Sequence, residues 1–154
     1  MESLQDKPEQ ALKEEGLHTV FLGLGTNLGN RQENMRQAYE QIEKLIGTIV
    51  RQSAFFETEP WGFQSTHLFL NSAICCKTRL LPREILWLTQ QIEKSLGRQY
   101  KSTGGIYHDR PIDIDILLYD NWTVHEPDLI IPHPHIMQRD FVLKPLMQIL
   151  FEKR

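Results

Sequence analysis

The sequence has few cysteines, and the two that it has argue against a disulfide-stabilised or thiol-based protein. Cys75 and Cys76 are adjacent in a stretch that reads as a β-strand. Neighbouring strand residues point to opposite faces, so these two cannot form a disulfide with each other, and unpaired thiols are typical of a reducing compartment. We therefore expect both thiols to fill the core of a cytoplasmic protein.

The chain also lacks a basic excess and a long apolar run. It has 17 lysines and arginines against 20 aspartates and glutamates, for a net charge of -3, whereas nucleic-acid and membrane-surface binders usually carry excess positive charge. No apolar run approaches the ~20 residues of a membrane-spanning helix, and the charged N-terminal stretch lacks the apolar segment of a secretory signal. We expect neither a nucleic acid nor a membrane as partner.

Length and composition predict one domain. The chain has 154 residues, 40% of them hydrophobic, which is enough to bury a single core. We expect residues 1–17 to be an N-terminal extension and residues 18–154 to form a single domain that acts as a monomer.

Periodicity and turn residues predict alternating strands and helices. Strands are expected over residues 18–25, 48–56, 67–78 and 111–119. One helix is expected to begin after Asn30, with Glu33 completing a capping box, and to end at Gly47; a second is expected to run from Pro82 to Gly97. A short fifth strand over residues 122–125 and a helical segment after residue 135 complete the chain.

This order, β-α-β-β-α-β, is typical of an α+β, ferredoxin-like fold. Such a fold has an antiparallel sheet with helices on one face, which leaves the other face open to build a site. The short extra strand and the C-terminal helical segment are additions to it. Because this fold hosts many functions, the function has to come from particular residues.

The stretch "DIDI" places two aspartates inside a predicted strand. Asp113 and Asp115 share one face, roughly 7 Å apart at Cα, while the isoleucines between them face the core. Aspartate is depleted in strands, and like charges on one face repel. The pair is either a solvated polar face or a metal site, and one or two Mg²⁺ ions would relieve the repulsion.

Several cations are expected near this pair. Arg110 precedes it by three residues, Arg98 and Lys101 stand in the preceding loop, and His133 and Arg139 follow later. Each alone reads as a surface charge, but carboxylates surrounded by phosphate-binding cations describe phosphoryl transfer. The sequence has no GxxxxGK[ST] loop, and its "GLGTNLG" does not match the dinucleotide fingerprint.

At this point six segments resemble one family. They are "GLGTNLGNR", "FETEPWG", "FLNSAI", "IEKSLGR", "RPIDIDIL" and "IPHPHIMQRDFVLKPL". In this order they resemble the 6-hydroxymethyl-7,8-dihydropterin pyrophosphokinase (HPPK) family of folate biosynthesis, from about residue 19 to residue 150. The chain departs from the family pattern at Tyr107-His108-Asp109, where a tryptophan followed by Gly-Pro is common.

The resemblance implies a reaction and a set of site residues. The enzyme would transfer the pyrophosphoryl group of ATP to the pterin hydroxymethyl oxygen with two Mg²⁺ ions and release AMP. Asp113 and Asp115 match the metal ligands and, with Arg98 and Arg110, the catalytic residues. Positions that match the ATP site are Gln90, Glu93, Arg98, Arg110, Ile116, His133 and Arg139. Positions that match the pterin pocket are Thr58, Pro60, Trp61, Phe69, Asn71 and Phe141.

The chemistry of the residues is compatible with this implication. A pterin is a flat heteroaromatic ring whose edge carries hydrogen-bond donors and acceptors, so its site needs aromatic walls and an amide or carboxylate. Phe69 and Asn71 share a strand face, and a mid-strand asparagine needs partners if it is buried. Without the resemblance, Phe69 and Phe141 fit core packing equally well, and Trp61 is either a cover over the pocket or an exposed side chain.

Two other functions stay open on the sequence alone. Another Mg-dependent phosphoryl transferase or phosphohydrolase would keep the aspartates without needing the pterin residues together. A non-catalytic nucleotide- or pterin-binding module would be expected to have lost the metal pair or the arginines, and the sequence keeps both.

Overall fold

The computed structural model describes residues 16–59, 67–97 and 111–151. The main sheet contains β1 (His18–Thr26), β2 (Gly47–Gln52), β3 (Phe56–Thr58), β4 (Phe69–Thr78) and β5 (Asp113–Tyr119), with the order β2-β4-β1-β5 and β3 paired to β4. All of these pairings are antiparallel. The order confirms the ferredoxin-like arrangement predicted from the sequence.

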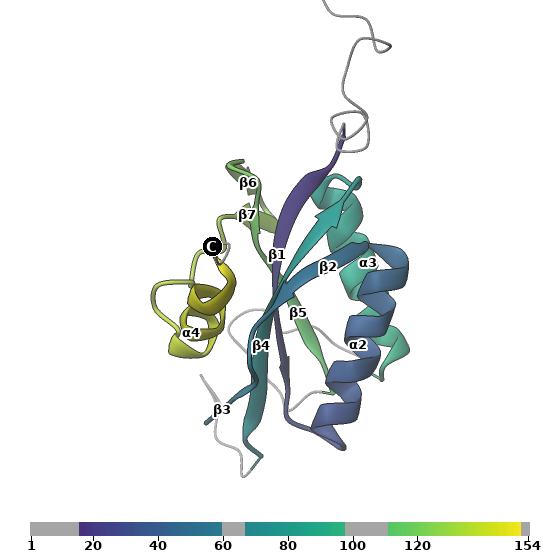
Figure 1. Cartoon of the computed structure of the whole chain (residues 1–154), viewed down its shortest axis with the longest axis vertical. Coiled ribbons are helices and arrows are strands. Elements are labelled where there is room, and N and C mark those ends of the chain that lie inside the picture. Colours follow the sequence, from purple (N-terminus) through teal and green to yellow (C-terminus); the bar gives the residue numbers. More distant parts are fainter. Residues whose placement is uncertain (1–15, 60–66, 98–110, 152–154) are drawn as a thin grey trace, which may run out of the picture.

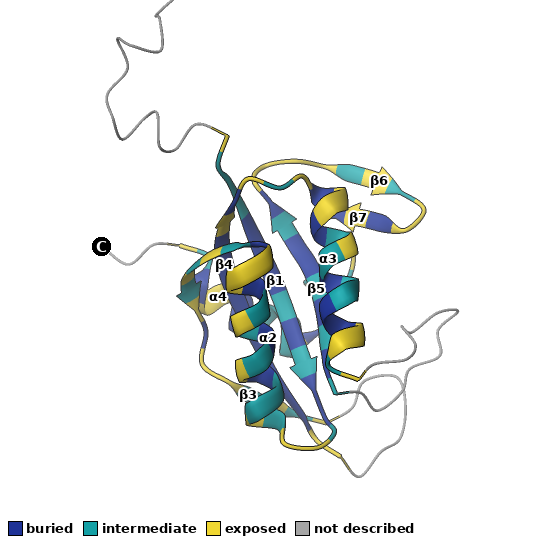
Figure 2. Ribbon diagram, turned by 90° about the vertical axis from the view of Figure 1, so that its right-hand side faces the viewer, coloured by how far each residue is buried: buried dark blue, intermediate teal, exposed yellow. Residues whose placement is uncertain are grey.

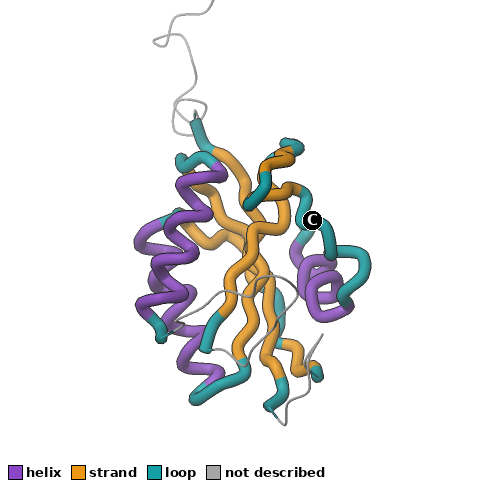
Figure 3. The backbone as a smooth tube through the Cα atoms, turned by 180° about the vertical axis from the view of Figure 1, so that it is seen from behind, coloured by secondary structure: helices purple, strands orange, loops and turns teal. Residues whose placement is uncertain are grey.

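Two helices cover one face of this sheet. They are α2 (Arg31–Leu45) and α3 (Pro82–Ser95), and both lie on the same side in Figures 1 and 3. The apolar stripe of α2 buries Met35, Ala38 and Ile42 against the even-numbered residues of β1, such as Leu22. In Figure 2 the strands behind these helices are coloured dark blue and teal, and yellow patches mark the exposed residues of the helices. This larger core positions β1 and β5, which carry the candidate site on their other face.

The other face is not fully open, contrary to the expectation from the fold pattern. The C-terminal helix α4 (Asp140–Ile149) packs across it, on the side opposite α2 and α3 (Figure 1). A second, smaller core joins Leu146 and Ile149 of α4 to Phe21, Ala73, Cys75 and Leu117 of the sheet. The helical segment expected after residue 135 is therefore confirmed, and among the residues that the structure describes it leaves one end of this face for a site.

The cysteines lie as predicted. Cys76 belongs to the core beneath α2 and α3, Cys75 belongs to the core beneath α4, and neither forms a disulfide. Burial raises the pKa of the Cys76 thiol to about 12.

The predicted second strand is broken in two. Ser53 interrupts it between β2 and β3, because the Ser53 hydroxyl accepts the Ala73 N–H at 2.9 Å where a strand carbonyl would. The Ala54 N–H in turn bonds the Gln148 side chain of α4 at 2.9 Å. The chain therefore bends here and starts β3 along the other half of β4.

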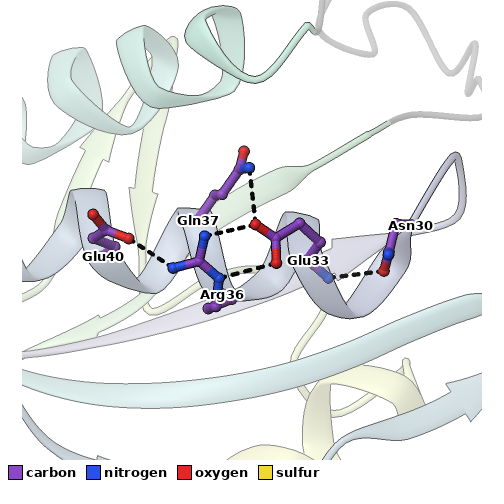
Figure 4. A network of polar contacts seen from close by, with 5 residues as sticks. All are labelled: Asn30, Glu33, Arg36, Gln37 and Glu40. Atoms are coloured by element: carbon purple, nitrogen blue, oxygen red, sulfur yellow. Dashed lines mark hydrogen bonds and ion pairs between the residues drawn. The ribbon is translucent and has the colours of Figure 1, made fainter.

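The first helix begins as predicted but ends differently. The Asn30 side chain accepts from the Glu33 N–H at 3.0 Å, whereas the Glu33 carboxylate accepts from Arg36 and Gln37 rather than closing the expected capping box (Figure 4). Gly47 is the first residue of β2 and has no left-handed backbone. Gly97, with φ of 103°, does end the second helix as expected.

A small hairpin follows the main sheet. It consists of β6 (Val124–Glu126) and β7 (Leu129–Ile131), where the sequence predicted one strand over residues 122–125. Trp122 stays outside it and packs on Tyr119, with ring centroids 4.8 Å apart. Two of the predicted strands also begin two residues late, at Phe69 and Asp113. None of the helices in the described ranges is long and apolar enough to cross a membrane.

Candidate functional site

A pocket of about 630 Å³, including its open mouth, lies at the end of the sheet that α4 leaves uncovered. It is lined by residues of β1, β3, β4, β5 and the start of α4. The lining residues are Gly23, Leu24, Gly25, Thr58, Glu59, Phe69, Asn71, Ser72, Asp113, Asp115, Leu117, Arg139, Phe141 and Val142. Seven of the candidate residues named from the sequence, Arg139 among them, are therefore brought together in one cavity.

Two glycines of the central strand form the floor of the pocket. Gly23 pairs with Asp115 and Gly25 pairs with Asp113 on one side, and Gly25 pairs with Asn71 on the other. A Cβ on Gly25 would lie 3.1 Å from the Asn71 Oδ1 atom, which is tighter than ordinary contact. With strands spaced ~4.8 Å apart, the aspartate side and the asparagine side of the pocket are roughly 10 Å apart. The glycines keep the space between them open.

The two aspartates project into this cavity from one face of β5. Both are half-buried, while Ile112, Ile114 and Ile116 are buried in the core beneath the helices, as the alternation predicted. Across the ranges that the structure describes, no group of three or more His, Cys, Asp or Glu side chains could hold a metal ion. Two carboxylates suit Mg²⁺, however, because this ion commonly completes its coordination with water and substrate phosphates.

The opposite side of the pocket presents an amide and an aromatic ring. The Asn71 Nδ2 donates to the Thr58 hydroxyl at 2.6 Å and to the Phe56 carbonyl at 3.3 Å. Since a carbonyl can only accept, the amide NH₂ must face β3, which directs Oδ1 toward Gly25 and the cavity. The Phe69 ring stands on the same strand face. Asn71 therefore offers the cavity a hydrogen-bond acceptor.

The start of α4 forms the remaining wall. Arg139 is only 8% exposed, and its guanidinium lies 5.7 Å from the centre of the Phe141 ring. An arginine stacked on an aromatic ring is held in one orientation, and its guanidinium group is suited to binding phosphate oxygens. Both residues were predicted to lie at the site, and both line the pocket.

His133 lies beside the aspartates. Its backbone N–H donates to the Leu117 carbonyl at 2.9 Å, which fixes it along the edge of β5. Its Nδ1 accepts from the His135 N–H at 3.2 Å, so the ring hydrogen is on Nε2. Burial lowers the pKa of His133 below the ordinary 6.5, while Asp115 acts in the opposite direction. The imidazole is therefore neutral near pH 7 and offers an N–H donor.

The remaining described candidates for the ATP site lie toward the outer edge of β5. They are Gln90, Glu93 and Ile116. Glu93 is 2% exposed, and its carboxylate accepts from the Ile114 N–H at 2.8 Å along the outer edge of the strand. Gln90 lies one turn away on the same face of α3. Ile116 has a buried side chain in the main core. Its backbone points to the same outer edge as that of Ile114, because residues two apart in a strand do so.

Several other predictions fall outside the described residues. These are Pro60, Trp61, Arg98 and Arg110, together with Lys101 and the departure at residues 107–109.

Sequence reasoning missed some of the lining. Leu117 continues the alternation of Asp113 and Asp115, so the same argument could have found it. Glu59 and Val142 follow Thr58 and Phe141 directly, but no pattern in the sequence marks them.

Comparisons with known proteins point to one family. Residues 21–151 match the family model described as 7,8-dihydro-6-hydroxymethylpterin-pyrophosphokinase (HPPK). A protein of Porphyromonas gingivalis named 2-amino-4-hydroxy-6-hydroxymethyldihydropteridine pyrophosphokinase is 50% identical over 131 residues, 84% of this chain and 89% of the relative. A protein of the same name from Aquifex aeolicus is 40% identical, over 85% of this chain and 79% of the relative.

Solved structures show the same fold at lower identity. A structure of an HPPK-DHPS in complex with substrates matches 89% of this chain with a TM-score of 0.69 and 16% identity, and a Plasmodium falciparum HPPK-DHPS matches 86% with a TM-score of 0.71 and 18% identity. This chain spans 40% of each of those longer chains. With the family model covering most of its length, the chain belongs to the 7,8-dihydro-6-hydroxymethylpterin-pyrophosphokinase (HPPK) family.

Proposed function

We propose that this protein transfers the pyrophosphoryl group of ATP to the hydroxymethyl group of 6-hydroxymethyl-7,8-dihydropterin, giving AMP and the dihydropterin diphosphate for folate biosynthesis. The observation that carries this proposal is the family match over residues 21–151, together with the 50% identity to a pyrophosphokinase of that name. The two-sided pocket supports it, because it offers acidic groups at one end and an aromatic, amide-lined surface at the other.

The pterin is assigned to the β4 side of the pocket. Phe69 and Phe141 would hold the faces of the ring, and the Asn71 Oδ1 would accept a hydrogen bond from a ring N–H. Thr58 supports the amide through its 2.6 Å hydrogen bond. Pro60 and Trp61 belong to the same proposed pocket by resemblance.

The phosphates are assigned to the β5 side. The donor set there fits Mg²⁺: Asp113 and Asp115 would hold two ions, which when bound neutralise phosphate charge. Arg139 lines the pocket together with the aspartates, and His133 is held against β5 by its hydrogen bond to Leu117; both would bind phosphate oxygens. Arg98 and Arg110 are proposed to do so from the preceding loop.

The adenosine part of ATP is assigned to the outer edge of β5. Gln90 and Glu93 face this edge from α3, and the backbone of Ile116 would present its N–H and C=O to the adenine ring. With the adenosine bound at this edge, the triphosphate of ATP would extend past the end of β5 to reach the aspartates. We propose that the protein carries out this reaction in the cytoplasm as a monomer.

The reaction follows from this arrangement. The pterin hydroxyl oxygen forms a bond to the β-phosphorus of ATP, the bond from the β-phosphorus to the oxygen bridging the α-phosphate breaks, and that oxygen leaves with AMP. The hydroxyl proton goes to solvent. The roughly 10 Å between Asn71 and the aspartates leaves the hydroxymethyl group room to meet the phosphates above the glycine floor. The arginines stabilise the charge that develops on the phosphoryl oxygens.

Nucleotide analysis by chromatography tests the proposal. Protein is incubated with ATP, Mg²⁺ and 6-hydroxymethyl-7,8-dihydropterin, and a parallel reaction omits the pterin. We expect AMP to form only with the pterin and no ADP to form. ADP in place of AMP would mean a phosphoryl rather than a pyrophosphoryl transfer and would contradict the proposal.

A further inference from the structure

Arg31, the first residue of α2, joins two segments that are distant from it in sequence. Its Nη1 donates to the Leu68 carbonyl at 3.0 Å, and its Nη2 donates to the Glu57 carboxylate at 2.8 Å. Glu57 lies in β3 and Leu68 immediately precedes β4. One guanidinium therefore holds both sides of the connection between these strands. The planar fork of arginine suits such a two-point contact, because its donors point in fixed directions.

The residues that Arg31 holds are next to the proposed pterin pocket. Glu57 and Thr58 are consecutive in β3, so their side chains point to opposite faces of the sheet. Glu57 faces Arg31, and Thr58 faces the cavity, where its hydroxyl accepts the 2.6 Å hydrogen bond from Asn71. A shift of β3 would therefore move the group that sets the direction of the Asn71 amide.

The short length of β3 makes this support significant. β3 has three residues, paired with Asn71, Leu70 and Phe69 of β4. A strand this short has few ladder hydrogen bonds to hold its position, and it lies at the edge of the sheet. The first turn adds a parallel contact, because the Asn27 side chain donates to the His67 carbonyl at 3.3 Å.

We propose that Arg31 is a positioning residue for the pterin site, acting through Glu57 and β3 on the Thr58–Asn71 pair. The inference rests on the proposed function and adds to it a residue that does not line the pocket. The contacts of Arg31 with Glu57 and Leu68, which we call the clamp, lie on the β4 side of the cavity. The clamp therefore governs the binding of the pterin ring and leaves the nucleotide side, on β5 and α3, unaffected.

Kinetics with both substrates test this assignment. The variants are Arg31→Met, Glu57→Gln and the double variant, with Arg36→Met as a control. Arg36 is a second arginine of α2, and it bonds only Glu33 and Glu40 of its own helix in the described residues (Figure 4). We expect Arg31→Met and Glu57→Gln each to raise the KM for the pterin about tenfold and to leave the KM for ATP within about twofold. The double variant should be no worse than Arg31→Met alone, because that substitution already removes the contact with Glu57.

A binding measurement separates this inference from the proposed function. Fluorescence titration with oxidised 6-hydroxymethylpterin reports ring binding without turnover, and we expect the same loss in Arg31→Met and none in Arg36→Met. If the wild-type protein turns over its substrates and Arg31→Met binds the pterin as tightly as the wild type does, the role of Arg31 is refuted and the proposed function is not. Equal loss of ATP and pterin binding would also refute the role of Arg31. Absence of pterin-dependent AMP from the wild-type chain would instead contradict the proposed function.

Discussion

The Asn71 side chain donates a 2.6 Å hydrogen bond to the Thr58 hydroxyl, which joins the first part of β4 to the end of β3 at the wall of the pocket. Both partners are positioned by the register, in which Phe56 pairs with Asn71 and Thr58 pairs with Phe69. Because this bond and the Phe56 carbonyl engage the amide NH₂, the direction of the Oδ1 acceptor is fixed before any ligand binds. The pocket is therefore organised in advance for a ligand that donates from a flat edge.

Replacing Asn71 by alanine is expected to weaken pterin binding and leave ATP binding largely intact. Loss of a buried hydrogen bond at a ligand site costs about 1–3 kcal/mol, or about 5- to 150-fold in affinity. Separate titrations with the pterin and with a non-hydrolysable ATP analogue measure the two effects. Equal losses in both titrations would contradict the assignment of the β4 side to the pterin.

Replacing Asp115 by asparagine is expected to lower kcat at least about 100-fold, because the phosphates and their metal ions lose a charged ligand. Asp120 provides a matched control at the far end of the same strand, where its carboxylate binds His18 at 2.7 Å, away from the pocket. Asp120→Asn should keep kcat near that of the wild type. Steady-state rates over a range of Mg²⁺ concentrations distinguish the variants, and near-normal turnover by Asp115→Asn would refute the metal assignment.

Much of this architecture could be predicted because it depends on local patterns. The alternation in "DIDI" was sufficient to place two aspartates on one face and two isoleucines in the core, and the paired prediction for Phe69 and Asn71 follows the same rule. Asn30 caps its helix because that interaction is made within one turn. The nearness of the β4 and β5 sides of the pocket also follows from the strand order once the ferredoxin-like pattern is assumed.

The parts that could not be predicted depend on contacts between distant segments. Ser53 breaks a strand because its hydroxyl meets Ala73, 20 residues later. The covering of the second sheet face by α4 depends on the apolar contacts of Leu146 and Ile149, which no local signal assigns to a partner. Arg31 reads from the sequence as the first residue of a helix, and only the fold brings it to Glu57.

The two cysteines are expected to be unreactive in the folded protein. Both side chains are fully buried, which keeps a reagent from reaching either sulfur, and burial also raises the pKa of the Cys76 thiol to about 12, so that thiol is almost entirely protonated at mildly alkaline pH. Mass spectrometry after iodoacetamide treatment should find no adduct on native protein and two adducts in denaturing guanidinium chloride. Rapid labelling of the native form would mean that one thiol is accessible and would contradict the assignment of both to the core.

The pH dependence of stability is expected to include a contribution from Glu33. Hydrogen bonds from Arg36 and Gln37 lower the pKa of the Glu33 carboxyl from 4.5 to about 2 in the folded protein. A carboxyl with a depressed folded-state pKa contributes stability above its unfolded pKa and loses that contribution as the pH falls. The difference in free energy of unfolding between the wild type and Glu33→Gln should therefore shrink from pH 4.5 to pH 2. Urea denaturation at several pH values measures this difference, and a difference that stays constant would contradict the prediction.

Gly47 is expected to be required by the close approach of two strands rather than by the end of a helix. Its backbone is not left-handed, so alanine could adopt it, but a Cβ there would overlap the Lys77 carbonyl oxygen and lie 2.9 Å from the carbonyl carbon. Both atoms are backbone, so β2 would have to move away from β4. We expect Gly47→Ala to lower the free energy of unfolding by at least about 2 kcal/mol.

The exposed neighbour Thr48 supplies the control for this substitution, since Thr48→Ala changes the same strand without a clash and should stay within about 0.5 kcal/mol of the wild type. Urea denaturation of the three proteins distinguishes the two explanations of the glycine. If Gly47 served only to end α2, alanine would restrict the unfolded chain and extend a favourable helical sequence, so the variant would be as stable as the wild type or more stable. A loss confined to Gly47→Ala is the result that the spacing of β2 and β4 requires.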